Sequence, residues 1–536
     1  MNSSLFTFVK SLTPHQISLL TLFILLKLFL IFMLPLTGDE AYFIVWGQTP
    51  SLGYYDHPPA VGWVLALMAM VADDLVWYRS FAFISAAIIG VLLYRLVMLD
   101  TNHQRAQHNQ IEKQKNLAIW VALAFFISPL SLMFVVTAND TVLVLFSMLG
   151  VYFFAKNLQH HQWSDAFWTG VFLGLAFLSK YFAAFMLLGL LAFSLKNWAQ
   201  IHKPQFGLML ALVLIAIAEN LYFNATHCWN NILFNFFSRT KEAEFEPANL
   251  FNFLLMIAVM LSPFGLWQWF KNRMNSNQKK SLSQSRHGID VVHLAVYAST
   301  PLLFVLAFVS LNNPIGLHWP LIAVTLLSVM YLTLNKTQLM KLYLFNGYFS
   351  LLIGGALLVA LFNINHVVSD AQKPRVSVYT EPTNVCALLP KDEMLFTLDY
   401  SSQSTLSYHC KNDDIHVFAS TSKYGREDDK HTNFKNLAGE SLKILVTKKK
   451  ELAKVTPYFD TTDISELILD NGVTYYLAEG QNFDYAQYRQ KVLLPVSERF
   501  YTPPNWLKSL SISNAESDPE SGSASVCGFK SKYDLP

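Results

Sequence analysis

The chain has 536 residues, of which 53% are hydrophobic and only 14% are charged, and its mean hydropathy is +0.31. This composition is too apolar for an ordinary soluble enzyme of that length and predicts a polytopic membrane protein. The formal net charge of +2, without a dominant basic tract, gives no reason to expect nucleic-acid binding.

Apolar segments recur through the first two thirds of the chain and predict about eleven transmembrane helices. They cover residues 17–36, 81–99, 117–136, 139–155, 166–179, 182–196, 207–224, 251–270, 290–310, 318–334 and 342–362. The first segment lacks a small-residue cleavage site, so we expect it to remain as an anchor. The shorter apolar stretch 60–72 is expected to form a helix at the membrane interface.

Lysine and arginine gather in alternate loops, which favours a cytoplasmic N-terminus. An odd number of crossings then places three segments outside the cytoplasm. These are the first outer loop 37–80, the loop 225–250 and the C-terminal part of the chain. An even number of crossings would place the C-terminal part of the chain in the cytoplasm.

From about residue 363 the composition changes to that of a soluble α/β domain. The expected strands are 394–399, 415–419, 442–447 and 474–477, and the expected helices between them include 402–408 and 451–458. The predicted fold class is therefore an α-helical polytopic membrane protein, residues 1–362, followed by an extracytoplasmic α/β domain, residues 363–536.

The four cysteines, Cys228, Cys386, Cys410 and Cys527, all fall on the predicted outer side of the membrane. An oxidising compartment permits pairing there, and the spacings fit no zinc site. We expect one disulfide within the soluble domain, joining Cys386 to Cys410 or to Cys527. The alternative is that these thiols are free.

Ionisable groups from several helix ends are predicted at the outer membrane surface. They are Asp39, Glu40, Asp56, His57, Asp140, Lys180, His227, Arg239, Lys241 and His318. Cations offset the charge of a phosphate while a carboxylate accepts a proton, so this set suits a site that handles an anionic head group beside the bilayer.

Several of these residues also have a structural explanation. The paired prolines after Asp56 and His57 stiffen a turn, which a purely structural loop would also need. Asp39 and Asp140 could be N-caps, and Glu40 could be a first-turn acid that the helix dipole favours. Lys180 could extend towards the interface, and His318 could belong to an interfacial aromatic belt.

The motifs together resemble a known family. They are the Asp39-Glu40 pair after the first helix, the turn GYYDHPP, Asp140 in TANDTVLVLF, the segment GLAFLSKYF and a late LHWP. In this order they resemble bacterial members of the dolichyl-phosphate-mannose protein mannosyltransferase-like superfamily, membrane glycosyltransferases of the C fold that include the aminoarabinose transferase of lipid A. The resemblance covers roughly residues 17–362.

The resemblance implies transfer of one sugar from a polyisoprenyl (undecaprenyl) phosphate donor to a lipid, glycan or protein acceptor, such as lipid A, at the outer face of a bacterial inner membrane. It implies that Asp39 is the catalytic base, with Glu40 and Asp140 in the catalytic set. Lys180 and Arg239 are implied as ligands of the donor phosphate. A single displacement predicts inversion at the anomeric carbon.

One position departs from the family pattern. The two residues before the prolines are Glu-Lys in the lipid A enzyme and Asp56-His57 here. A permanent positive charge is therefore missing, and His57 is a weaker candidate for binding the donor phosphate. Asp56, Tyr42, Tyr55 and His318 are expected to line the substrate cavity. Some members of the wider fold use a divalent metal, for which Asp56, His57 and His227 could be ligands.

Two other classes of function fit parts of the sequence. A transporter or flippase of lipid-linked sugars would share the apolar spans and the basic groups, but it would favour internal repeats and helices broken at the bilayer midplane. A non-enzymatic scaffold would bind envelope partners through the soluble domain and tolerate changes in the acidic loop.

Overall fold

The computed structural model describes residues 12–100, 108–238, 245–275, 289–391, 393–419, 425–512 and 528–536. The chain forms two compact units that are interleaved in sequence. Unit 1 consists of Met1–Leu34, Ala72–Ile217 and Ala243–Leu361, and unit 2 of Pro35–Val71, Ala218–Glu242 and Phe362–Pro536. The segment after the first apolar helix therefore folds together with the C-terminal part of the chain.

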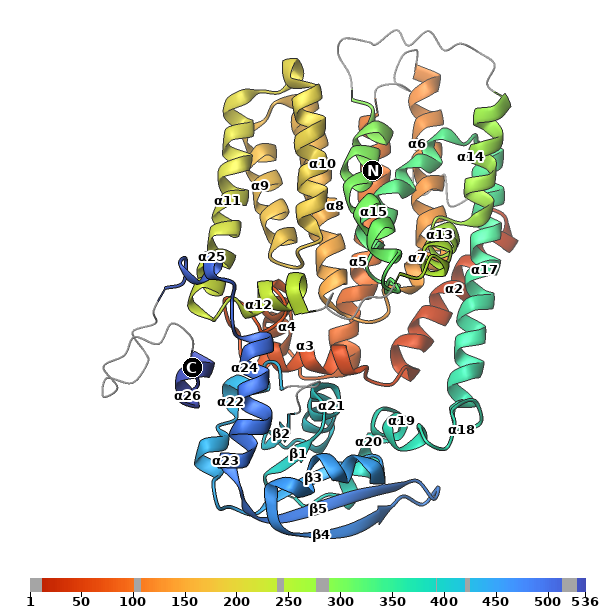
Figure 1. Ribbon diagram of the computed structural model, residues 1–536. Coiled ribbons are helices and arrows are strands. Elements are labelled where there is room, and N and C mark those ends of the chain that lie inside the picture. The colour runs from red at the N-terminus through yellow and green to blue at the C-terminus, as the bar shows by residue number, and fades with distance from the viewer. Residues whose placement is uncertain are drawn as a thin grey trace. The chain divides into compact units, whose positions relative to one another are not determined.

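Unit 1 is built from long apolar helices (Figure 1). Within it α8 packs against α9, α10 against α15, and α5 against both α6 and α8. Its helices are α2 (Pro14–Met33), α5 (Leu75–Leu99), α6 (His108–Phe126), α7 (Pro129–Leu132), α8 (Asn139–His160), α9 (Trp163–Phe177), α10 (Ala183–Lys196), the larger part of α11 (Lys203–Thr226), α13 (Ala248–Met260), α14 (Pro263–Asn275), α15 (Val291–Ser310), α16 (Leu321–Leu327) and nearly all of α17 (Lys336–Phe362).

The expected count of about eleven crossings is not confirmed. In the described part of the chain six helices are long and apolar enough to cross a membrane, or seven if the bent pair α13 and α14 forms one span. All eleven predicted segments are at least partly helical, but α9 has 15 residues and α10 has 14. At about 1.5 Å per residue these two fall short of a hydrocarbon core of about 30 Å.

The pair α13 and α14 shows why one predicted segment is not a simple span. The two helices meet at an angle of 89°. Ser262, between them, has a left-handed backbone with φ 65°, and Pro263 follows it. Because the residue before a proline is disfavoured in the helical region, the sequence itself ends α13 here.

Arg79 and Lys27 are buried in unit 1, where they contact uncharged groups. Arg79 on α5 donates from Nη1 to the backbone oxygens of Ile31 and Leu34, at 2.8 and 2.7 Å, and so satisfies carbonyls at the end of α2. Lys27, in the middle of α2, donates to Ser131 Oγ at 3.1 Å. Its amine also lies between 5.3 and 5.9 Å from the ring centroids of Phe23, Phe83 and Phe126, an arrangement that cation–π attraction stabilises.

Unit 2 contains a mixed sheet, with five strands in the order β2-β1-β3-β5-β4 among the described residues. β1 pairs in parallel with β2 and with β3, whereas β5 is antiparallel to both β3 and β4. The strands are β1 (Leu395–Thr397), β2 (Ile415–Val417), β3 (Leu442–Val446), β4 (Phe459–Ile468) and β5 (Thr474–Phe483).

Helices complete unit 2. They are α3 (Gly38–Gln48), α4 (Ala60–Ala69), α12 (Asn230–Leu233), α18 (Ile364–Val367), α19 (Lys373–Thr380), α20 (Pro382–Leu388), α21 (Tyr400–Cys410), α22 (Asp428–His431), α23 (Tyr485–Tyr488), α24 (Leu494–Phe500), α25 (Asn505–Lys508) and α26 (Gly528–Lys532). The short apolar helix predicted at 60–72 is thus confirmed as a helix, α4, of 10 residues.

All four predicted strands are confirmed, and β5 runs six residues further than expected, to Phe483. The predicted helix at 402–408 is α21, but the segment at 451–458 forms 3₁₀ turns instead of an α-helix. β4 was not predicted. Most of its residues are exposed, so it lacks the alternating apolar pattern that identifies a half-buried strand.

Cys386 and Cys410 form the disulfide that the sequence left open between two partners, and it joins α20 to the end of α21. Cys228 is also disulfide-bonded, so the free-thiol alternative is wrong for all three of these cysteines. Cys527 lies outside the described residues.

We expect the double substitution Cys386→Ser/Cys410→Ser to destabilise unit 2 by about 3 kcal/mol, because the bond closes a loop with a sequence separation of 24 residues. Thermal unfolding of the purified chain, with and without reductant, measures this. Reductant should lower the apparent Tm of wild type more than that of the double variant. Equal sensitivity to reductant would contradict the expectation.

Candidate functional site

The two acids after α2 have different environments. Thr37, not Asp39, is the N-cap of α3, since its hydroxyl accepts from Glu40 N at 3.3 Å while Glu40 Oε2 accepts from Thr37 N at 3.4 Å. This reciprocal pair is a capping box, which gives the buried Glu40 a structural task. The suggestion that Asp39 caps the helix is therefore wrong.

Asp39 is exposed and accepts a hydrogen bond from the phenol of Tyr400 on α21, at 3.0 Å. Burial raises the pKa of Tyr400 to about 12, even though Arg426 lowers it. Tyr400 therefore stays protonated at neutral pH and donates to the carboxylate. An exposed carboxylate held in this way can still accept a proton.

Asp56 lies at the centre of a buried polar cluster in unit 2. Its side chain is 1% exposed, and its Oδ2 is 2.9 Å from Arg426 Nη1. Its Oδ1 accepts from the Tyr42 phenol at 3.5 Å and lies 3.3 Å from His57 Nδ1. The Arg426 guanidinium also stacks on Tyr400, 3.8 Å from the ring centroid. Arg426 thus links the carboxylate of Asp56 to the tyrosine that binds Asp39.

Local bonds hold Arg426 in place. Its backbone is left-handed, with φ 56°, which is uncommon for a residue with a side chain. Asp428 accepts from Val417 N on β2 at 2.9 Å, and Glu427 accepts from Tyr55 N at 2.7 Å. The sheet and the GYYDHPP turn therefore both hold the two residues that follow Arg426. Arg426 was missed from the sequence because 370 residues separate it from Asp56.

The two tyrosines expected in the substrate cavity are buried. Tyr42 is 3% and Tyr55 is 1% exposed. Tyr55 packs edge-on against Phe234 and Tyr501, with centroids at 6.0 and 5.7 Å. Burial, with the carboxylates of Asp56 and Glu427, raises the pKa of Tyr42 well above its ordinary value, so Tyr42 remains a neutral donor.

Unit 1 contains the second group of predicted site residues. Asp140 lies in the first turn of α8, where the helix dipole favours a carboxylate, but it does not cap the helix, whose N-cap residue is Ala138. Lys180, in the turn between α9 and α10, contacts both carboxylate oxygens of Asp140, at 2.9 and 2.8 Å. His318 Nε2 lies 4.0 Å from the same carboxylate.

Aromatic side chains join the same two motifs. The Lys180 amine lies 5.0 Å from the centroid of Phe182, and that ring packs against Trp319 at 5.6 Å. The segments GLAFLSKYF and LHWP therefore meet at Asp140, as expected for parts of one site. Asp140 and Lys180 are only 6% and 8% exposed in their side chains, whereas His318 is 43% exposed.

Other predicted ligands are not brought together. Arg239 and Lys241 lie outside the described residues. His227 stacks on Phe223 at 4.1 Å and contacts the Phe223 carbonyl at 2.9 Å through Nδ1. Within the described ranges no group of three or more His, Cys, Asp or Glu side chains could hold a metal ion, so the set of Asp56, His57 and His227 is not assembled.

We expect Asp140→Asn or Lys180→Met alone to destabilise unit 1 by about 3 to 5 kcal/mol, because each leaves an uncompensated buried charge. The double variant Asp140→Asn/Lys180→Met removes both charges and should recover most of that loss. Apparent Tm values of the three variants in detergent measure the coupling. Strictly additive losses would contradict a paired role.

Arg426→Ala should lower the apparent Tm, because it removes the cation that pairs with the buried Asp56. Since the arginine is partly exposed, we expect the free energy of unfolding to fall by about 2 kcal/mol. Arg426→Lys keeps the charge but loses the planar stacking on Tyr400, so an intermediate Tm is expected. A matched control is Lys430→Ala, which removes a cation from the same segment that pairs with Glu427 instead. An equal fall in apparent Tm for Arg426→Ala and Lys430→Ala would contradict the role of Arg426 as the cation that stabilises Asp56.

Residues 56–223 match the family model for dolichyl-phosphate-mannose-protein mannosyltransferase, a range that includes Asp56, Asp140 and Lys180. A lipid A galacturonosyltransferase, RgtD, from Rhizobium johnstonii is 26% identical over 196 residues. That alignment covers 35% of this chain and 38% of the relative, so the chain matches well under half of the relative's length.

Solved structures extend the comparison to most of the chain. ArnT from Cupriavidus metallidurans in the apo state superposes with a TM-score of 0.55 at 13% identity, covering 87% of this chain and 98% of that one. The same enzyme bound to undecaprenyl phosphate gives a TM-score of 0.57 at 12% identity, covering 86% and 97%. The resemblance inferred from the motifs is thus confirmed: the chain has the fold of ArnT and matches the dolichyl-phosphate-mannose-protein mannosyltransferase family over residues 56–223.

Proposed function

We propose that the protein is an inverting membrane glycosyltransferase that moves a sugar from a polyisoprenyl-phosphate donor, such as undecaprenyl phosphate, to an envelope acceptor. The observation that carries the proposal is the exposed Asp39 carboxylate, which a neutral tyrosine positions directly after the first apolar helix. The ArnT relative was solved with undecaprenyl phosphate, and the Rhizobium relative is named for lipid A. Both names support this donor and a lipid A-like acceptor.

The reaction needs one proton acceptor. An acceptor hydroxyl forms a bond to the anomeric carbon while the bond from that carbon to the phosphate oxygen breaks. The hydroxyl proton goes to Asp39, and the lipid phosphate leaves with the electron pair. Tyr400 holds Asp39 in a fixed orientation, and Glu40 is the structural partner that starts α3.

The leaving phosphate needs cations. We assign Lys180 to this task, with Arg239 and His57 as further candidates. Asp140 holds the Lys180 amine in one position, so it belongs to the catalytic set as a positioning residue. His318 is the more exposed neighbour, and we assign it to substrate binding. We assign the same task to Asp56, Tyr42 and Tyr55, which are buried in unit 2.

We place the protein in a bacterial inner membrane, with a cytoplasmic N-terminus and with the α/β domain, residues 363–536, in the periplasm. The Cys386–Cys410 disulfide supports this side of the membrane, because such bonds persist in oxidising compartments. The arginine and lysine bias of the alternate loops supports the same orientation.

Asp39→Asn should abolish sugar transfer by the purified chain reconstituted with an undecaprenyl-phosphate-linked sugar and lipid A, with the product followed by mass spectrometry. The amide cannot take the hydroxyl proton, so a loss of at least about 100-fold is expected from general-base catalysis. Asp463→Asn is the matched control, since it makes the same change at an exposed carboxylate on β4.

The result also separates a transferase from a transporter. A transporter would leave the bond between sugar and phosphate intact in wild type, so no free undecaprenyl phosphate would accumulate. Full activity of Asp39→Asn, at an unchanged apparent Tm, would overturn the assignment of Asp39 as the base.

A further inference from the structure

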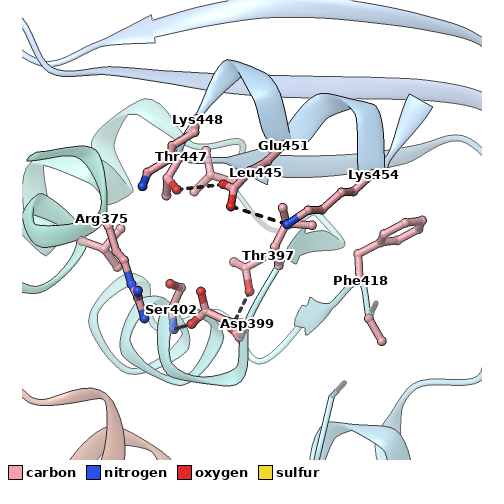
Figure 2. Close-up of a pocket in the computed structure, with 13 residues that line it drawn as sticks. Arg375, Thr397, Asp399, Ser402, Phe418, Leu445, Thr447, Lys448, Glu451 and Lys454 are labelled. Carbon is pink, nitrogen blue, oxygen red and sulfur yellow. Dashed lines mark hydrogen bonds and ion pairs between the residues drawn. The ribbon is translucent and has the colours of Figure 1, made fainter. Parts of the chain in front are cut away.

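The carboxyl ends of the three parallel strands in unit 2 surround a cavity of about 130 Å³ (Figure 2). The loop after β1, the loop after β3 and the end of β2 all contribute to it. The cavity is lined by Arg375, Val378, Thr397, Leu398, Asp399, Ser402, Phe418, Ala419, Leu445, Thr447, Lys448, Glu451 and Lys454. A space of this size holds several waters or a small polar ligand.

The topology marks this place as a binding crevice. The chain leaves β1 through α21 towards β2 on one side, whereas it leaves β3 towards β4 and β5 on the other side. Connections that diverge from neighbouring parallel strands open a crevice at their carboxyl ends, where open α/β sheets bind ligands. The cavity lies at this divergence of β1 and β3.

Two of its cations have no counter-charge. Arg375 and Lys448 reach the cavity from α19 and from the loop after β3, and neither has an ion-pair partner in the described ranges (Figure 2). The two carboxylates that line the cavity each have a contact within the protein. Asp399 accepts from Ser402 N at 2.9 Å, and Glu451 accepts from the Thr447 hydroxyl at 3.2 Å while lying 3.9 Å from Lys454 Nζ.

A buried hydroxyl is also unsatisfied. Ser402 is 4% exposed, and its Oγ has no partner of normal hydrogen-bond geometry in the described part of the chain, although it is near enough to the Tyr379 phenol to offset part of the rise that burial causes in the pKa of Tyr379. Leaving a buried polar group unpaired costs about 1 to 3 kcal/mol, so such a group in a cavity wall indicates a missing ligand atom or water. Figure 2 shows Ser402 lining the same cavity as Arg375 and Lys448.

We propose that this cavity binds a sugar phosphate, with the phosphate at Arg375 and Lys448 and the sugar hydroxyls at Ser402, Asp399 and Glu451. The unpaired cations match an oxyanion, and carboxylate and hydroxyl oxygens match the hydroxyls of a sugar. A bare inorganic phosphate would use the cations but leave the second group of ligands without a partner. The binding itself is independent of the proposed transferase reaction.

The test is calorimetric titration of the full chain in nanodiscs with glucose 6-phosphate, with glucose and with inorganic phosphate. We expect saturable binding of glucose 6-phosphate, weaker binding of phosphate and none of glucose. Arg375→Ala and Lys448→Ala should each raise Kd about tenfold or more, and Ser402→Ala should raise it less. Lys450→Ala is the matched control, because this exposed neighbour does not line the cavity, and its Kd should stay within about twofold.

A second assay identifies the source of the sugar phosphate and rests on the proposed function. If it is the head group of a phosphorylated glycolipid acceptor, Lys448→Ala raises the KM for that acceptor and leaves kcat unchanged. If it is a free metabolite, Lys448→Ala weakens glucose 6-phosphate binding with KM unchanged. Unaltered binding by Arg375→Ala and Lys448→Ala, equal binding of glucose, or no saturable heat in wild type overturns the proposal without affecting the assignment of Asp39.

Discussion

The cost of burying a charge among apolar helices is the constraint that shapes this protein. Unit 1 meets it in three ways: Lys180 pairs with Asp140, Arg79 binds backbone carbonyls, and Lys27 lies among aromatic rings. Asp140 offsets the charge of the buried Lys180 amine and, in the proposed function, holds that amine in position for the donor phosphate. This pair is therefore the buried group of unit 1 that the proposed function assigns to the donor phosphate.

Unit 2 uses the same kind of pairing to join segments that are far apart in sequence. Asp56 comes from the turn after α3, and Arg426 comes from the C-terminal part of the chain. Because this pair also contacts the tyrosine that holds Asp39, the acid expected to carry out chemistry is positioned by residues near position 400 and not by its own helix. A change in the α/β part can therefore alter the orientation of Asp39 without touching the apolar helices.

The sequence predicted the elements whose cause is local. Apolar runs identified the helices, and the short strands β1 to β3 follow from buried apolar residues in sequence. The predicted number of crossings is not confirmed, because hydropathy alone does not reveal that α9 and α10 are shorter than a usual span. The sequence could not reveal Arg426, whose contact depends on the tertiary fold, or β4, whose exposed polar residues form a strand only by pairing with β5. Asp140, Lys180 and His318 were found because each stands beside a helix end in an apolar context, where a charge is unexpected.

The disulfide at the end of α21 has a consequence for the orientation of Asp39. One end of this helix is tied to α20 by Cys410, and the other end carries Tyr400. The helix has 11 residues and spans about 16 Å, so it acts as a short rod between a covalent bond and the Asp39 carboxylate. Reduction of this bond would thus release one anchor of the helix that carries Tyr400, the tyrosine that orients Asp39.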